Sequence, residues 1–146
     1  MKPQKQAVSL VIRDDQGRFL VVKRPNSAHD ELAGVWGFPA ATLREGELEL
    51  EGCQRIARTK LGIKVEIGRR IGNGRDERKA YHLSLTDYEA KISEGTPNVP
   101  QSDTSVTQYD ECKFTDNPAL LYPAAQKGSL CTQVFLKSIG KNWGEL

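Results

Sequence analysis

Two short apolar runs near the N-terminus predict a β-hairpin. The first run extends from Gln6 to Ile12 and the second from Phe19 to Val22, and both are rich in Val, Leu and Ile. Between them, the segment Asp14 to Gly17 consists of residues that favour a turn. After a polar loop, Val35 to Phe38 is predicted to be a short strand that ends at Pro39. The N-terminal part of the chain is therefore predicted to consist of strands.

A helical pattern follows between Glu49 and Leu61. Its apolar residues recur at spacings of three and four, at Leu50, Cys53, Ala57 and Leu61. This spacing places apolar side chains along one side of an α-helix. Gly62 is expected to end the helix, because glycine readily adopts the left-handed conformation found after many helices. Gly52 lies inside the helix, where glycine costs about 1 kcal/mol relative to alanine.

Further strands are predicted after this helix. Val65 to Ile71 and Ala80 to Leu85 have strand composition, and the glycine-rich segment 72–77 between them is expected to be a loop. Tyr88 to Ile92 is a further strand candidate. A long loop with several Gly, Pro and Ser residues follows.

The C-terminal third is predicted to contain one strand and two helices. The strand is expected over Thr107 to Phe114, after which Asp116 can cap a short helix and Ser129 a final one. The apolar side of the final helix comprises Leu130, Val134, Phe135 and Ile139. This order of elements predicts an α+β fold in which helices pack on a mixed sheet.

Composition and charge narrow the possible classes of protein. The 146 residues, 38% of them hydrophobic and 27% charged, suit one domain over residues 1–146. A net charge of +2 is too small to indicate general binding to nucleic acid or membranes. No early apolar run is long enough for a signal peptide or a membrane span, so a cytoplasmic location is expected.

The cysteines and histidines do not form a metal-binding motif. Cys53, Cys112 and Cys131 include no CxxC pair and are odd in number, which predicts reduced structural thiols rather than disulfides or a zinc site. His29 and His82 have no partner at the spacing of metal ligands. We therefore expect no chemistry from these five side chains.

The segment from position 41 to position 63 resembles the signature of the Nudix hydrolase family (nucleoside diphosphate linked to X). That signature is Gly, five residues, Glu, seven residues, then Arg-Glu-apolar-x-Glu-Glu-x-Gly-apolar. Five positions match at the correct spacing, namely Glu47, Arg55, Ala57, Gly62 and Ile63. The resemblance implies a Nudix-like αβα sandwich, a mixed β-sheet flanked by the Nudix helix and a C-terminal helix. It also implies a structural frame made by Glu47, Arg55 and Gly62, and a possible homodimer.

The Nudix box is degenerate at the positions that carry its chemistry. Ala41 replaces the first glycine, and Ile56, Thr59 and Lys60 replace the three glutamates of the core. In the family, the helix face with these glutamates holds Mg²⁺ or Mn²⁺, which activates water for attack on a diphosphate. The three replacements change the formal charge from −3 to +1. Metal-dependent pyrophosphohydrolase activity is thus expected to be lost or strongly reduced, and Mg²⁺ or Mn²⁺ is required only if the protein is active.

Basic and aromatic residues near the same segment predict a site for a phosphorylated ligand. The candidates are Arg44, Lys60, Lys23, Arg24 and Trp36, which could hold a nucleotide or another phosphorylated metabolite without cutting it. Two interpretations of Lys60 remain open. It is either an ordinary exposed helix lysine or an ammonium that stands where a metal would and pairs with a phosphate.

Two other functions stay open at the level of sequence. An active Nudix pyrophosphohydrolase would need a rearranged metal site built from Glu47, a neighbouring glutamate and Glu111, with Asp110 close to it in sequence. A protein interaction scaffold without any ligand is the third possibility, because the apolar stripes are equally typical of a core.

Overall fold

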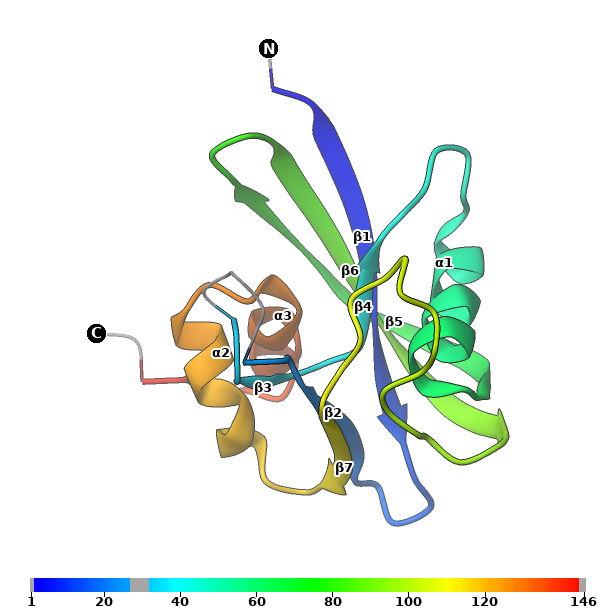
Figure 1. Cartoon of the computed structure of the whole chain (residues 1–146). Helices are drawn as coiled ribbons and strands as arrows, with labels where there is room; N and C mark the ends of the chain where they lie inside the picture. Colours follow the sequence, from blue (N-terminus) through cyan, green and yellow to red (C-terminus); the bar gives the residue numbers. More distant parts are fainter. Residues whose placement is uncertain (1, 27–31, 145–146) are drawn as a thin grey trace.

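The computed structural model describes residues 2–26 and 32–144, which form a seven-stranded mixed sheet with helices on both sides (Figure 1). The strands are β1 (Gln4–Arg13), β2 (Phe19–Lys23), β3 (Trp36–Gly37), β4 (Ala40–Thr42), β5 (Lys64–Glu77), β6 (His82–Glu94) and β7 (Glu111–Thr115). The helices are α1 (Glu49–Ile56), which continues as a π-helical turn (Ala57–Leu61), a 3₁₀ turn (Pro118–Leu121), α2 (Tyr122–Gln126) and α3 (Leu130–Ser138). In this part of the chain, no helix has the length and apolar character needed to cross a membrane.

Strand β1 lies at the centre of the sheet. The main order is β3-β2-β1-β6-β5, while β4 also pairs with β1 and β7 with β2. The β1–β6 pairing is parallel along the whole of β1, and the other pairings are antiparallel. The predicted N-terminal hairpin is confirmed, since Arg13 of β1 pairs with Phe19 of β2 across the turn.

Successive residues of β1 enter two separate cores, because side chains alternate between the faces of a strand. Val8, Leu10 and Ile12 pack with buried residues of α1 and the π-helical turn. Ala7 and Val11 belong to the other core, which contains buried residues of α3. Figure 1 shows α1 on one side of the sheet and α2 and α3 on the other. The predicted sandwich of helix, sheet and helix is confirmed.

The helix at Glu49 is confirmed, and Cys53, Ala57 and Leu61 of its predicted apolar side are completely buried, whereas Leu50 is not. Leu50 is 52% exposed, whereas Ile56 is completely buried beneath the helix. The last turn is π-helical, a wider turn that often occurs near functional sites. It ends at Gly62, which has a φ of 69°, the left-handed conformation that glycine adopts without strain.

The loop predicted over residues 72–77 is wrong, because β5 runs through it to Glu77. Likewise, Tyr88 to Ile92 is not a separate strand but part of a continuous β6. The glycines are required there by packing: a β-carbon on Gly74 would lie 2.8 Å from side-chain atoms of Leu130 and Val134 in α3. These glycines therefore bring a helix close to a strand and do not mark a turn.

The C-terminal elements differ from the predictions in detail. The strand is shorter than Thr107 to Phe114 and begins at Glu111. The cap of the short helix is Asn117, whose side chain accepts a hydrogen bond from a backbone N–H, and not Asp116. Ser129 precedes α3 but makes no side-chain capping bond. On the final helix, Ile139 is exposed rather than packed.

Candidate functional site

The loop that leads into α1 is fixed to the helix by a buried ion pair. Glu47 Oε2 accepts a hydrogen bond of 2.8 Å from Arg55 Nε, and Oε1 accepts one of 2.8 Å from a terminal guanidinium nitrogen of the same arginine. Oε1 also accepts the Arg44 backbone N–H at 3.0 Å. The hydrogen bonds from Arg55 lower the pKa of Glu47 to about 2 despite partial burial. Both oxygens of Glu47 thus serve the shape of the loop.

The three positions that carry glutamates in the Nudix signature have different environments here. Ile56 is completely buried in the core between α1 and the sheet. The Thr59 hydroxyl donates to the Arg55 carbonyl at 2.7 Å. Lys60 lines a cavity. The residues that replace the glutamates therefore supply one cation and no carboxylate.

Lys60 is a buried lysine, so its interpretation as an ordinary exposed helix lysine is wrong. Its side chain leaves the π-helical turn, and Nζ donates to the Ala40 carbonyl of β4 at 2.7 Å. Nζ also lies 3.4 Å from the Tyr109 hydroxyl and 5.1 Å from the centre of that ring. Burial, reinforced by the charges of Arg24 and Arg55, lowers the pKa of Lys60 to about 8.

Lys60 lines a cavity of about 460 Å³ that we name the cationic cleft. Its lining comprises Ala7, Arg24, Ala40, Ala41, Thr42, Arg44, Arg55, Lys60, Tyr81, Leu83, Ser105, Val106 and Thr107. Four of these described lining residues are cationic and none is a carboxylate. Strand β4 and the turn after α1 contribute one part of the wall, and the long loop between β6 and β7 contributes another. The cleft therefore favours an anionic ligand.

The structure brings together three of the five predicted ligand-binding residues. Arg24, Arg44 and Lys60 line the cationic cleft. Lys23 is not among the lining residues; its Nζ lies 3.4 Å from Glu111 and 6.0 Å from the centre of the Trp36 ring. Trp36 lies outside the lining as well and packs, half-buried, against the core beneath α3. In this position Trp36 is a packing residue, so the prediction that it lines the ligand site is wrong.

The acidic candidates for a rearranged metal site are not gathered in the cleft. The side chain of Glu111 is 59% exposed and pairs with Lys23. Near α1, Glu49 accepts a hydrogen bond of 2.6 Å from the Tyr88 hydroxyl, and Glu51 accepts one of 2.8 Å from the Leu48 backbone. Within residues 2–26 and 32–144, no three His, Cys, Asp or Glu side chains are placed to hold a metal ion together. The donor set thus does not fit Mg²⁺ or Mn²⁺. His29 lies outside the described residues.

Several lining residues were not recognised as site residues in the sequence. Tyr81 lines the cleft, and Lys5 Nζ lies 4.5 Å from its ring centre. Ser105 to Thr107 belong to the long loop, which has no periodic pattern from which its position could be predicted. That loop is tied to the π-helical turn by Gln108, whose side-chain amide donates to the Thr59 carbonyl at 3.0 Å. Only the tertiary contact reveals that the loop forms a wall.

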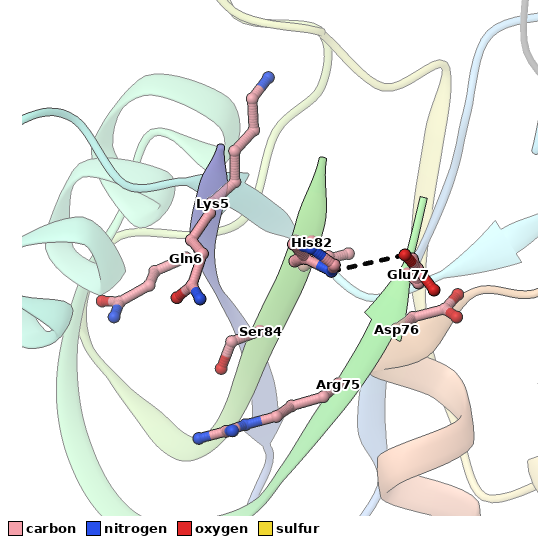
Figure 2. A pocket seen from close by; sticks show the side chains of 9 residues that line it. Lys5, Gln6, Arg75, Asp76, Glu77, His82 and Ser84 are labelled. Atoms are coloured by element: carbon pink, nitrogen blue, oxygen red, sulfur yellow. Dashed lines mark ion pairs between the residues drawn. The ribbon is translucent and has the colours of Figure 1, made fainter. Parts of the chain in front are cut away.

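A second cavity, of about 390 Å³, lies beside the strands β1, β5 and β6 (Figure 2). Its lining carries both signs of charge: Lys5 and Arg75 face the same space as Asp76 and Glu77. His82 Nδ1 lies 4.0 Å from Glu77 Oε1, the pair joined by a dashed line in Figure 2. Because the charges are mixed, this cavity does not select an anion or a cation, and the cationic cleft remains the candidate site.

Comparisons with known proteins agree with this architecture. A family model described as NUDIX domain matches residues 3–129. The ORF135 protein of E. coli has 19% sequence identity and a TM-score of 0.72, with 95% of this chain and 93% of that chain covered. A MutT protein from Methanosarcina mazei Go1 has 17% identity and a TM-score of 0.71, with 94% of each chain covered. A MutT NUDIX hydrolase from Burkholderia pseudomallei has 24% identity and a TM-score of 0.63, with 77% of this chain and 83% of that chain covered.

These structural likenesses establish the fold, and their low identities leave the ligand open. No curated protein matches the sequence. The α+β class and the mixed sheet between helices are confirmed by the solved structures.

Proposed function

The chain belongs to the Nudix domain family, and we propose that its cationic cleft binds a nucleotide or another phosphorylated metabolite while metal-dependent pyrophosphohydrolase activity is lost or strongly reduced. The observation that carries this proposal is the composition of the cleft, four cations and no carboxylate among its described lining residues. We treat residues 1–146 as one domain of this family.

Mutual repulsion among the cations supports an anionic ligand. Arg24 and Arg55 both lower the pKa of Lys60, so their positive charges act on the same point in the cleft. The Arg55 charge is offset by Glu47, which pairs with it. A phosphate group in the cleft would be attracted by these positive charges, and arginine guanidinium groups can bind phosphate oxygens through two parallel hydrogen bonds.

The same residues argue against hydrolysis. A divalent metal in a Nudix enzyme neutralises the diphosphate and activates the attacking water, and it requires oxygen ligands. Here the ammonium of Lys60 donates to the Ala40 carbonyl, which takes up an oxygen atom of the cleft. Ile56 is buried in the core, and its aliphatic side chain has no atom that could bind a metal. The described lining of the cleft retains charge that can hold a phosphate and includes no carboxylate that would bind a metal.

Turnover measurements test the loss of activity. The full chain is incubated with Mg²⁺ or Mn²⁺ and a panel of nucleoside triphosphates, dinucleotides and nucleotide sugars, beside an active Nudix hydrolase as the positive control. We expect phosphate or pyrophosphate release at the background rate. Robust metal-dependent release from this chain would contradict the proposal and favour the alternative, an active enzyme with a rearranged metal site.

The resemblance also implies a homodimer, and the short apolar runs of the sequence led us to expect a cytoplasmic location; both stay predictions. Light scattering at several protein concentrations measures the assembly directly. A molar mass twice that of the chain is the expected result, and the mass of one chain at every concentration would contradict it.

A further inference from the structure

We propose that Lys60 is a reactive amine that forms an imine with phosphorylated aldehydes bound in the cationic cleft. This inference rests on the proposed function, because the arginines of the cleft must first hold the phosphate group. It adds a covalent site and a chemical class of ligand, an aldehyde that carries a phosphate.

The surroundings of Lys60 are those of a lysine that is kept from water and, among residues 2–26 and 32–144, is not paired with an acid. Among the described residues, the hydrogen-bond partners of Lys60 Nζ are the Ala40 carbonyl and the Tyr109 hydroxyl, both of which are uncharged. Only 5% of the residue is exposed, although it lines the cleft. A lysine under these conditions carries its proton less firmly than a lysine on the surface.

The fraction of neutral amine follows from this environment. Burial and the positive charges of Arg24 and Arg55 lower the pKa of Lys60 to about 8, so much of the amine is neutral in mildly alkaline solution. Lys64 provides the contrast, since its side chain is 75% exposed and its Nζ lies 3.2 Å from Glu94. Neutral lysine is the form that attacks carbonyl groups. Lys60 is therefore better suited to react than the nearby Lys64.

The phosphate requirement follows from the residues that share the cleft with Lys60. Arg24 and Arg44 line the same cavity, whose volume of about 460 Å³ is in the range that holds small ligands. A phosphate bound at Arg44 would hold the rest of a small ligand in the same cavity as Lys60. Since proximity converts a reaction between two molecules into one within a complex, an aldehyde on that ligand would react faster than a free aldehyde.

The chemistry requires no metal and no redox partner. The lone pair of Nζ attacks the aldehyde carbon, which forms a C–N bond and a carbinolamine. The carbinolamine then loses water, whose oxygen comes from the aldehyde and whose two hydrogens balance those lost by the amine. The Tyr109 hydroxyl, 3.4 Å from Nζ, is a nearby proton donor, and burial raises its pKa to about 12 so that it stays protonated. The product is an imine between ligand and Lys60.

Selective labelling of the full wild-type chain tests the proposal. The probe is pyridoxal 5′-phosphate, with pyridoxal as the matched aldehyde that lacks phosphate. After brief reaction at pH 8 and reduction with borohydride, peptide mapping measures the modification of each lysine. We expect Lys60 to be labelled roughly tenfold faster than Lys64, because the cleft holds the phosphate of the probe in the same cavity as Lys60. Labelling of Lys60 by pyridoxal should be slower, and excess pyrophosphate should protect Lys60 without protecting Lys64.

A thermal-shift measurement with pyrophosphate on the same preparation separates this proposal from the proposed function. If pyrophosphate stabilises the chain but Lys60 is labelled no faster than Lys64, the imine is overturned and phosphate binding stands. If pyrophosphate neither stabilises the chain nor protects Lys60, both proposals fail. Equal rates with pyridoxal and its phosphate would overturn the stated class of ligand.

Discussion

Glu47 is a residue whose surroundings indicate a structural role. Its two oxygens accept three hydrogen bonds, and its partner Arg55 is only 6% exposed. Glu47→Gln would place an amide against the guanidinium and leave much of a buried charge unpaired. We expect the free energy of unfolding to fall by about 2 to 3 kcal/mol, measured by urea denaturation at pH 7. The exposed Glu45→Gln serves as the control, and an equal effect of both changes would contradict this role.

Asp87 is a second residue whose surroundings predict a measurable effect. It is fully buried in β6, where the Ser9 hydroxyl donates to one carboxyl oxygen and no described group donates to the other. Burial raises the pKa of Asp87 to about 8. Between about pH 4 and pH 8 the folded chain keeps a proton that the unfolded chain releases. Stability contributed by this group is therefore complete below pH 4 and falls as the pH rises toward 8.

The change Asp87→Asn tests this pH dependence. Wild-type stability should fall by up to about 1.4 kcal/mol per pH unit through this window because of Asp87, and the variant should lack that slope. Thermal or urea unfolding at several pH values measures it. Asp110→Asn, at an exposed position, is the control that should retain the slope. Parallel curves for wild type and Asp87→Asn would contradict the assignment.

At the scale of elements, contact between α3 and β5 depends on glycine. A side chain at Gly74 would meet Leu130 and Val134 at 2.8 Å. We expect Gly74→Val to lower the free energy of unfolding by about 1 to 3 kcal/mol through overpacking, despite the higher strand propensity of valine. Glu66→Val, on the same strand at an exposed position, should change it little. Similar stabilities for the two variants in urea denaturation would show that α3 adjusts without cost.

The long loop between β6 and β7 is held in place by the side chain of Gln108. The Gln108 side chain accepts the Gln101 backbone N–H at 2.8 Å and donates to the Asp103 and Thr59 carbonyls at 2.7 and 3.0 Å. Gln108→Ala should raise amide hydrogen exchange across the loop and lower stability by about 1 to 3 kcal/mol. The exposed Gln16→Ala is the control. Unchanged exchange would mean that Gln108 does not hold this wall of the cleft.

These elements also show which features of the fold can be predicted from local sequence patterns. The hairpin β1–β2 and the helix at Glu49 were predictable because their apolar spacing is local. Gly72 and Gly74 appeared to mark a loop, since the helix that requires them lies almost 60 residues later in the chain. The burial of Lys60 was unpredictable for the same reason. Its partners in β4 and in the long loop are brought together only by the fold.

At the scale of the whole molecule, the Nudix frame is retained while the charge of its cleft is inverted. The Glu47–Arg55 pair, the αL residue Gly62 and the sheet between helices form the frame. The family resemblance predicted this frame, and the sequence itself shows that Ile56, Thr59 and Lys60 replace the three glutamates. Arg24 and Arg44 line the cleft, whereas Lys23 does not. The sequence could not predict this difference, because it depends on how β4 and the loop pack against α1.

Calorimetric titration with pyrophosphate tests most directly whether side-chain cations hold the phosphate without a metal. Dissociation constants are measured in EDTA and in excess Mg²⁺ for the wild type, Arg44→Ala and the control Lys23→Ala. We predict binding in EDTA, no strengthening by Mg²⁺, about tenfold or greater weakening in Arg44→Ala from loss of a charged hydrogen bond, and little change in Lys23→Ala. Binding that appears only with Mg²⁺ would contradict the account.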